Sequence, residues 1–537
     1  MGKKYFYERN SEMIDSDLNK KFEDILLMSD ADFEQWVRDL RKFVVYLWDE
    51  RGQPPRVGYD ESEIIEQFRE MEKETFTKSI FNDLHAGETT KAKGSVFRST
   101  KTLGNAVNQF FPTMMKTRIN YTSDTSAGKS IYDFFSKDEL FNTFHTYAKR
   151  HFKRDSFYSY SVPVRVMENE RYGVLPVAET GPEWIKAFEA GTFRQRKWDY
   201  FLCANSEEKY TGYSEEMRAL TNLRVTQQDV KELSILPEHC KTQVSNKEGE
   251  SYVIRVYEKG QKLFPIGLKA FRISFCQYAV NFPPLIAKYV FEKYTEEWKH
   301  EKKIFVWDPS AGWGGRLLGA MSVDMDRHIV YLANDPNTDH NTTPGRTKYH
   351  ELYDFYRDNV NRDTGNLWPK KHTEFGFWQM GSEEMQFDPG FQLFRGKLSL
   401  VFTSPPYFSK EAYSEDEGQS YKKFGEYAAW RDGFLKETLK TAVEWLRPGG
   451  YLAWNIADVV FAGETLPLEE DSRKFLKELG MIEETPLKMC LASMPGGNRL
   501  DKETGLPKAK HFCKIKDGNK PKLWLKYEPI FIFKKPQ

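Results

Sequence analysis

The chain has 537 residues, in which 79 lysines and arginines are balanced by 79 aspartates and glutamates. This length exceeds one ordinary hydrophobic core, so we expect two or three domains. The balanced charge excludes any argument about partners from net charge, and only local basic patches can indicate phosphate binding.

The five cysteines lie far apart and form no Cys-x-x-Cys pair. This spacing favours a reducing compartment and argues against a zinc module, so we expect no metal site. No apolar run reaches the roughly 18 residues of a membrane span, and the first residues lack the apolar core of a signal peptide. We therefore expect a cytoplasmic protein that does not cross a membrane.

The first 150 residues are predicted to form a helix-rich N-terminal region. Apolar residues recur at three- and four-residue spacing over 30–50 and again over about 61–76, which predicts a pair of helices. Between 86 and 130 the composition turns to Thr, Ser, Gly and Lys without a regular period. We expect this part to be rich in loops.

Residues 151–261 are predicted to form a mixed α+β segment. Alternating apolar and polar residues over 158–166 and 252–257 indicate strands, which lie among shorter helical patterns. The segment is a candidate for target recognition.

Residues 262–537 alternate between strand and helix patterns. Alternation of this kind predicts an α/β domain with a mostly parallel sheet, covered by helices on both faces, whose ligands lie at the carboxyl ends of the strands. The expected strands are 304–308, 329–335, 375–380, 397–403 and 449–456, with a closing pair near 482–491 and 523–533. One helix is expected to begin near 314, and three more are expected over about 344–360, 426–446 and 470–479.

The first of these strands runs into the turn Asp308-Pro309-Ser310-Ala311-Gly312-Trp313-Gly314-Gly315-Arg316. Small residues in such a turn let a ligand come close to the backbone at the start of a helix, although glycines also serve tight turns. Asp335, about 20 residues after the glycines, suits a ribose diol. The G-x-G-x-x-G spacing is absent, which disfavours a nicotinamide or flavin enzyme.

The strand over 397–403 ends in Ser404-Pro405-Pro406-Tyr407. Two prolines remove two backbone donors, so the sheet pairing stops there and the chain becomes rigid. A simple proline turn is one interpretation. The other is a tip that holds a hydroxyl, a carbonyl and an aromatic ring in fixed positions.

Together, the turn at 308–316, Asn334-Asp335 and Thr403 to Tyr407 resemble the motifs of S-adenosylmethionine-dependent amino-methyltransferases, which modify the exocyclic nitrogen of adenine or cytosine in DNA. The resemblance covers 262 to the C-terminus. It implies a Rossmann-like class I methyltransferase fold with a seven-stranded, mostly parallel sheet, and S-adenosylmethionine as cofactor. It also implies DNA modification in a bacterium or a phage-infected host.

The resemblance assigns roles to individual residues. The segment at 281–284 is similar to the one that closes over the methionine part of the cofactor in this family. The cofactor-binding residues that it implies are Phe282, Pro283, Asp308, Ser310, Ala311, Gly312, Gly314, Asp335, Ser382, Glu383 and Thr403. The implied catalytic residues are Ser404, Pro405, Pro406 and Tyr407.

The tip suits a base amine, which is a poor nucleophile because its lone pair is delocalised into the ring. The Ser404 hydroxyl and the Pro405 carbonyl would accept its hydrogens and expose the lone pair. Tyr407 would stack on a base flipped out of its helix. Serine at the first position leans towards cytosine N4 in this family, while adenine N6 stays open.

Other interpretations remain open, namely an RNA base methyltransferase and a catalytically silent nucleic-acid-binding protein. The expected partner is nucleic acid, in the first place double-stranded DNA. Two basic patches could neutralise its phosphates, although such runs are also common on solvated faces. They comprise Lys149, Arg150, Lys153 and Arg154, and Lys508, Lys510, Lys514 and Lys516.

Two further features lie near the tip. The acidic run 411–420 directly follows it, and we interpret this run as a lid, because long loops beside a site usually cover it. Asn455 and Asp458 end the next strand, where they could line a target pocket or cap a helix.

Overall fold

The computed structural model describes residues 17–18, 20, 28–51, 59–85, 94–98, 103–119, 128–149, 279–323, 327–360, 373–461, 463–490, 501, 503–508, 510–519 and 523–537, with strands between 157 and 257. They belong to two compact units. The larger contains the described parts of Trp48–Asp133 and Arg272–Gln537, and the smaller those of Ser11–Leu47 and Phe134–Phe271.

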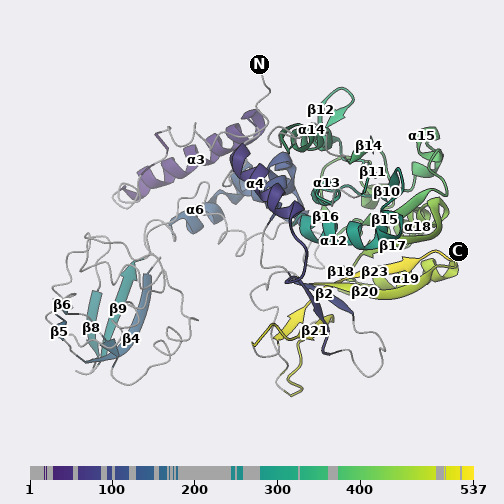
Figure 1. The fold of residues 1–537 in the computed structure, drawn as a ribbon. Helices are drawn as coiled ribbons and strands as arrows, with labels where there is room; N and C mark the ends of the chain where they lie inside the picture. The colour runs from purple at the N-terminus through teal and green to yellow at the C-terminus, as the bar shows by residue number, and fades with distance from the viewer. Residues whose placement is uncertain are drawn as a thin grey trace. The chain divides into compact units, whose positions relative to one another are not determined.

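A nine-stranded sheet forms the centre of the larger unit, with the order β1-β2-β20-β23-β17-β15-β10-β11-β14 (Figure 1). The strands β14, β11, β10, β15 and β17 run parallel to one another, and β23 runs antiparallel to both of its neighbours. The bounds are Ile80–Asn82 (β1), Ser95–Arg98 (β2), Ile304–Asp308 (β10), Ile329–Asn334 (β11), Glu374–Trp378 (β14), Leu398–Thr403 (β15), Leu446–Asn455 (β17), Ile482–Cys490 (β20) and Glu528–Lys534 (β23).

The predicted α/β class, a Rossmann-like mostly parallel sheet, is confirmed by this order. The predicted strand count of seven needs a correction. The seven strands from 304 onward are extended by β1 and β2 from the N-terminal part, since β2 runs parallel to β20 with Val96 opposite Lys488. Strands of three and four residues are too short to show an alternating pattern in the sequence.

Helices cover both faces of the sheet and form two hydrophobic cores. Successive residues of β10 point to opposite faces, so Val306 lies in one core and Trp307 in the other. The first core contains residues of α4 (Glu61–Glu72), α12 (Pro284–Thr295), α13 (Gly315–Met321) and α14 (Lys348–Val360). The second contains residues of α15 (Pro389–Gln392), α17 (Tyr427–Trp430), α18 (Lys436–Trp445) and α19 (Leu468–Glu478).

The helix predicted over 426–446 contains an irregularity. Between α17 and α18 the residues Arg431–Leu435 form a π-helical turn. Gly433 lies in this turn, and a Cβ there would be 2.3 Å from the ring of Phe424. The packing of Phe424 against the helix therefore depends on this glycine.

Short elements complete the larger unit. They are η1 (Asn105–Phe110), η2 (Pro112–Lys116), β3 (Arg118–Ile119), η7 (Glu296–Trp298), η8 (Thr338–His340), β12 (Asn341–Thr343), β13 (Arg346–Thr347), η9 (Met385–Phe387), β16 (Glu411–Ala412), α16 (Ser420–Lys423), β18 (Val459–Phe461), β19 (Glu464–Leu466), β21 (Phe512–Ile515) and β22 (Leu523–Lys526).

The N-terminal part is more closely joined to the nine-stranded sheet than we expected. Residues 103–119 form 3₁₀ turns, and Val107, Phe111 and Met114 lie in the first core. Lys288 of α12 is fully buried and donates to the carbonyls of Met71, Glu72 and Glu74 at the end of α4, at 2.8–3.0 Å. Tertiary packing therefore joins described residues of 59–119 to the sheet.

The smaller unit contains most of α3 (Asp30–Arg51), together with η3 (Asp138–Leu140) and α6 (Phe141–Lys149). α5 (Ile131–Ser136) spans the division between the units. The ring of Phe33 lies 5.6 Å from that of His145, and Arg38 lies over the ring of Phe141 at 3.7 Å. The predicted helix over 30–50 is confirmed by α3.

A second sheet of the smaller unit has the order β7-β4-β9-β8. Its strands are β4 (Phe157–Arg165), β7 (Val177–Ala178), β8 (Gln243–Lys247) and β9 (Ser251–Tyr257), and β5 (Glu168–Asn169) pairs with β6 (Gly173–Val174). β4 and β9 match the two strands predicted at 158–166 and 252–257. The helices that we expected among them lie outside the described residues.

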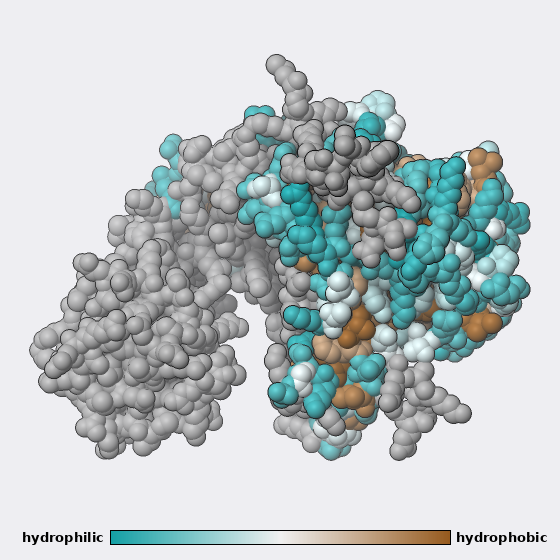
Figure 2. Space-filling view, viewed as in Figure 1, coloured by the Kyte–Doolittle hydropathy of each residue, from teal (hydrophilic) through white to brown (hydrophobic). Residues whose placement is uncertain are grey.

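The coloured face of the larger unit in Figure 2 is mostly hydrophilic, with limited hydrophobic areas between. Single exposed hydrophobic residues such as Phe387 and Leu393 are common on protein surfaces. In the described part of the chain, none of the helices combines the length and apolar character needed to span a bilayer.

Candidate active site

The candidate site lies where four neighbouring parallel strands end. The strand β10 lies between β11 and β15, and the order of the sheet reverses there. In open α/β sheets, ligands bind at the carboxyl ends of strands beside such a reversal. The turns after β15, β10, β11 and β14 therefore form one edge, to which Ser404, Gly312, Asp335 and Glu383 belong.

Asp308 joins two of these turns. Its carboxylate accepts hydrogen bonds from Arg316 Nε at 2.8 Å, from Thr403 Oγ1 at 2.7 Å and from the Tyr331 hydroxyl. Asp308 and Thr403 are fully buried, so neither presents an accessible side-chain atom to a ligand. Their contacts connect the end of β15, which Ser404 follows, to the glycine turn, and the expected part of both residues in cofactor binding stays a prediction.

Tyr331 was not a candidate in the sequence. Burial, together with the neighbouring Asp308 carboxylate, raises its pKa well above the ordinary value. The hydroxyl therefore stays protonated and donates a hydrogen bond to Asp308. Its position in a fully buried strand is the only signal, since a buried tyrosine hydroxyl normally needs a partner.

Gly312 and Gly314 of the turn differ in the space that a side chain would find there. Gly312 has φ +59°, and a Cβ there would have its nearest neighbour, Arg316 Nη2, at 3.7 Å. Gly314 has φ +71°, and a Cβ there would lie 2.8 Å from both Leu352 and Phe111. Gly314 is therefore required for packing, whereas Gly312 leaves room for a ligand close to the backbone.

Ser310 and Ala311 complete the turn. Ser310 is partly exposed, and its carbonyl accepts a hydrogen bond from Arg316. Ala311 is buried, and its N–H donates to the carbonyl of Asn334 at 3.0 Å. This bond connects the glycine turn to the end of β11.

Asp335 follows β11 and is partly exposed. Its Oδ2 accepts the N–H of Gly312 at 3.0 Å, and its Oδ1 accepts the N–H of Asn337 at 3.0 Å. Burial raises its pKa to about 6, although these backbone hydrogen bonds act in the opposite direction. Asp335 is thus an oriented acceptor beside the open glycine, as a ribose diol requires.

Tyr349 and His340 support the glycine turn and were missed in the sequence. The Tyr349 hydroxyl donates to the Gly312 carbonyl and lies 3.0 Å from His340 Nδ1, while His340 Nε2 lies 3.1 Å from Thr113 Oγ1. Burial lowers the pKa of His340 to about 3, so the ring is neutral. Residues on a helix and in a polar loop carry no pattern that would reveal this network.

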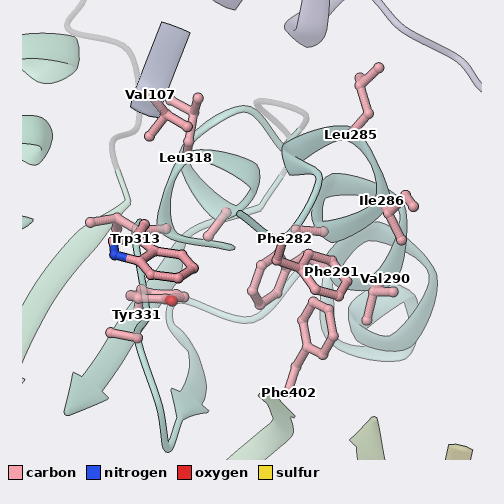
Figure 3. Close-up of a cluster of buried hydrophobic side chains, with 14 of the residues drawn as sticks. Val107, Phe282, Leu285, Ile286, Val290, Phe291, Trp313, Leu318, Tyr331 and Phe402 are labelled. Carbon is pink, nitrogen blue, oxygen red and sulfur yellow. The ribbon is translucent and has the colours of Figure 1, made fainter. Parts of the chain in front are cut away.

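Phe282 and Pro283 lie next to the glycine turn. Figure 3 shows Phe282 among the rings of Phe291 and Phe402, and its centroid lies 5.3 Å from that of Phe402. Pro283 directly precedes α12. Phe282 is buried in this core, so its contacts support the turn, whereas the resemblance implied that it closes over the cofactor.

Asn281 fixes this segment to the turn. Its Nδ2 donates to the Trp313 carbonyl at 2.8 Å, and a Cβ on Gly315 would lie 2.2 Å from the Phe282 carbonyl oxygen. The two segments are therefore in direct backbone contact, as the order of the motifs suggested.

Ser382 and Glu383 follow β14. The Ser382 hydroxyl pairs with that of Thr438 at 2.9 Å. Glu383 Oε1 accepts from Lys423 Nζ at 2.7 Å, whereas its Oε2 is buried and has no hydrogen-bond partner among the described residues. Glu383 therefore has a buried acceptor that a ligand amine could satisfy.

The proline tip is connected to residues far away in the sequence. Ser404, Pro406 and Tyr407 are partly exposed and Pro405 is buried. The Tyr407 hydroxyl donates to Glu528 Oε1, and the nearby Ser404 side chain acts to lower the pKa of Tyr407, which burial raises overall. We expected the Tyr407 ring to stack on a base, and the described contacts add a role for its hydroxyl.

The residue after the tip is strained. Phe408 has φ +52°, in the left-handed region that non-glycine residues rarely adopt, and its side chain is buried. Its ring packs against those of Tyr427, Trp430 and Phe461 at 5.6–5.8 Å. Strain that packing maintains is typical of functional sites.

The segment predicted as a lid lies against the glycine turn and the end of β11. The Tyr413 ring packs on Trp313 at 5.6 Å, and Asp416 Oδ2 accepts from Thr338 N at 3.1 Å. β16 pairs with β3, and Arg118 donates to Glu415 at 2.7 Å. Acidic residues of this run therefore form contacts within the unit, which gives them a structural role even if a nucleic-acid phosphate lies nearby.

Of the two candidates after β17, Asp458 caps a helix. Its Oδ1 accepts from Glu469 N, in the first turn of α19, at 3.0 Å, and Glu469 Oε1 accepts from Asp458 N at 3.1 Å. Asn455 Nδ2 donates to Glu528 Oε1 at 3.2 Å and to the Pro529 carbonyl at 3.0 Å. Asn455 therefore belongs to the surroundings of the tip.

The basic residues of the predicted patches have different surroundings. Lys149 donates to Asp30 at 3.0 Å, and Lys510 binds Glu469 at 3.0 Å as well as Asp458. Lys508 lies 3.7 Å from Asp501, Lys514 lies over the Trp524 ring at 4.6 Å, and Lys516 is exposed. Arg150, Lys153 and Arg154 lie outside the described residues.

In the described parts of the chain, no group of three or more His, Cys, Asp or Glu side chains is arranged to hold a metal ion.

No family model and no curated protein matches the chain. Among solved structures, it is similar to a precorrin-6y C5,15-methyltransferase of Geobacter metallireducens, with 14% identity over 46% of this chain and 87% of that one, and a TM-score of 0.24. A proposed class I S-adenosylmethionine-dependent methyltransferase of Listeria monocytogenes has 15% identity over 50% and 67%, and a TM-score of 0.26.

A proposed DNA modification methylase of Thermus thermophilus has 22% identity over 29% of this chain and 53% of that one, with a TM-score of 0.18. The chain therefore spans about half the length of that protein. With TM-scores this low, the description of the fold rests on the strand order given above.

Proposed function

We propose that the chain is an S-adenosylmethionine-dependent methyltransferase that transfers a methyl group to the exocyclic amine of a nucleic-acid base, cytosine N4 or adenine N6 in DNA. The observation that carries the proposal is the hydrogen bond from Thr403 to Asp308 at 2.7 Å. It supports a site in which Ser404 lies beside the glycine turn.

The residues present fit the cofactor. Asp335 is an acceptor for the two ribose hydroxyls, the open side of Gly312 leaves room for the ligand, and Glu383 Oε2 is an acceptor for the adenine amine. These groups follow β11, β10 and β14, in the spatial order β10-β11-β14 along the sheet. When bound, the cofactor supplies a methyl group on a sulfonium centre.

The tip would orient the base amine. The Ser404 hydroxyl oxygen and the Pro405 carbonyl oxygen accept its two hydrogens, and the prolines keep these acceptors fixed. Orientation of two reactants in this way can contribute about 7–11 kcal/mol to lowering a barrier.

The test starts with thermal unfolding in the presence of S-adenosylmethionine or a nicotinamide dinucleotide. We expect stabilisation by the first and none by the second. Labelled cofactor is then incubated with double-stranded DNA, single-stranded DNA and RNA, followed by mass spectrometry of the nucleosides.

A methylated cytosine or adenine amine in DNA is the expected result. Modification of RNA alone would identify RNA and not DNA as the substrate. The absence of any labelled nucleoside would contradict the proposal. Ser404→Ala is the matched inactive variant, because it removes one acceptor and leaves the cofactor contacts in place.

A further inference from the structure

Glu528 is a carboxylate beside the tip that the mechanism above does not use. It opens β23, remains partly accessible, and accepts hydrogen bonds at the same oxygen, Oε1, from the Tyr407 hydroxyl and from Asn455 Nδ2. It lies 121 residues after Tyr407, so no motif connects the two.

Other charged groups near Glu528 come from several elements. Glu411 of β16 and Glu469 of α19 are negative, whereas Lys526 of β22 is positive and exposed. Glu411 accepts a hydrogen bond from the Tyr413 hydroxyl. Burial raises the pKa of both Glu528 and Glu411, so each can take up a proton more readily than an exposed glutamate.

The direction of the hydrogen bonds follows from the number of protons. Tyr407 has one hydroxyl proton, and it donates this proton to Glu528. Towards the neighbouring Ser404 hydroxyl, the Tyr407 oxygen can therefore act only as an acceptor. As a result, the Ser404 oxygen has its lone pairs available for the hydrogens of a base amine.

We propose that Ser404, Tyr407 and Glu528 form a relay that takes the proton released by the methylated amine to the Glu528 carboxylate. This inference rests on the proposed function. The N–C bond forms as the S–C bond breaks, and the proton leaves the nitrogen in the same step, as positive charge develops on it. Its proton passes to the Ser404 oxygen, the Ser404 proton to the Tyr407 oxygen, and the Tyr407 proton to Glu528.

The charges balance in this sequence. The sulfonium becomes a neutral thioether, the product amine is neutral, and Glu528 ends as a neutral acid, which later loses its proton to water through its accessible part. Ser404 and Tyr407 return to their neutral forms, with each hydroxyl proton replaced by that of its neighbour.

The experiment measures single-turnover methylation of the DNA identified above, at saturating cofactor, for wild type, Glu528→Gln, Tyr407→Phe and the double variant. General acid–base groups contribute about 10²–10⁴-fold, so we expect each single variant to lose about 100-fold or more in rate. The double variant loses no more than the larger single effect, because both residues act in one relay.

The pH profile separates a relay from a structural role. The wild-type rate falls towards low pH as Glu528 becomes protonated before the reaction, and this fall is absent in Glu528→Gln. Glu483→Gln is the matched control, because Glu483 lies on β20 opposite the other end of β23 and binds Arg473 and Lys477. It keeps the wild-type profile.

Wild-type methylation with an unchanged rate in Glu528→Gln, or additive losses in the double variant, would overturn the relay alone. Absence of methylation by the wild type on every nucleic acid would overturn the proposed function and the relay with it. Tyr407→Phe keeps the aromatic ring, so it tests the hydroxyl even if Glu528→Gln unfolds.

Discussion

The glycine turn after β10 and the proline tip after β15 lie at neighbouring strand ends, yet they are held in different ways. The turn is held by hydrogen bonds with Arg316, Asn281 and Tyr349, of which the last lies 37 residues after Gly312, and by glycines that permit its backbone. The tip depends on Glu528, on the pairing of β3 with β16, and on a strained Phe408. The comparison teaches that most hydrogen bonds of the glycine turn come from residues closer in the sequence than those of the proline tip, which bonds to Glu528, 121 residues after Tyr407.

The largest expected effect would break the connection between the two regions. Asp308→Ala leaves the buried Arg316 guanidinium without its carboxylate. Removing one partner of a buried ion pair costs about 3–5 kcal/mol, so we expect the free energy of unfolding to fall by that amount in urea denaturation. Glu417→Ala, at a strongly exposed side chain, is the control and leaves stability unchanged. A loss below about 1 kcal/mol for Asp308→Ala would show that Asp308 is not the anchor.

The second prediction sharpens the comparison within the turn. Gly314→Ala places a Cβ against Leu352 and Phe111 at a positive φ, and we expect a loss of about 2–4 kcal/mol in unfolding free energy. Gly312→Ala has the positive φ without the clash, so its loss is about 1–2 kcal/mol.

The affinity for S-adenosylmethionine should distinguish Gly312→Ala from Gly314→Ala. Gly312→Ala fills the open side of the turn, so we expect its affinity for S-adenosylmethionine to fall about tenfold or more, about 1.4 kcal/mol. Calorimetric titration of both variants provides the measurement. Normal affinity in Gly312→Ala would place the ligand elsewhere.

The third prediction uses the pKa of Asp335, which is raised to about 6 by burial. In the proposed site the ionised carboxylate would accept both ribose hydroxyls and a protonated carboxyl would accept less well, so we expect cofactor affinity to be lost as pH falls through about 6. We expect constant affinity above about pH 7 and a decrease of up to about tenfold per pH unit below 6. Asp335→Asn binds more weakly, and its affinity should not change over this range in titration calorimetry. A wild-type affinity without pH dependence would contradict this assignment.

The smallest expected effect concerns the lid. Glu415→Ala removes the contacts with Arg118 and Lys422 from a largely exposed side chain, and such ion pairs contribute about 0.2–1 kcal/mol each. We expect KM for the nucleic acid to rise about two- to threefold through looser closure, with little change in kcat. Lys422→Ala removes one of the two basic partners and serves as a comparison. A large fall in kcat for Glu415→Ala would give the lid a part in the chemistry.

Much of the fold was predictable because its strands are long and apolar and end in recognisable turns. β10, β11, β15 and β17 begin and end close to the predicted residues. β1 and β2 could not be predicted, because three or four residues carry no period and only their pairing with β20 makes them strands. The short turns over 103–119 were taken for loops for the same reason.

The candidate site was predictable to a similar degree. The sequence pointed to the four strand ends and to Asp335 and the tip. It did not distinguish residues with an atom open to a ligand from residues that fix the backbone around the site. The contacts of Asp308, Thr403 and Gly314 are of the second kind. That distinction depends on which side chains fill the space around them.

By itself, the amino-acid sequence determined the alternation of strands and helices, the turns at their ends and the residue types placed there, because these follow from periodicity and backbone chemistry within a few residues. Only the tertiary structure decided that two N-terminal strands extend the sheet, that Asp308 is saturated by Arg316, Tyr331 and Thr403, and that Glu528 meets Tyr407. Contacts between residues of different strands and turns depend on how the strands are ordered, and that order is set by packing of the whole unit.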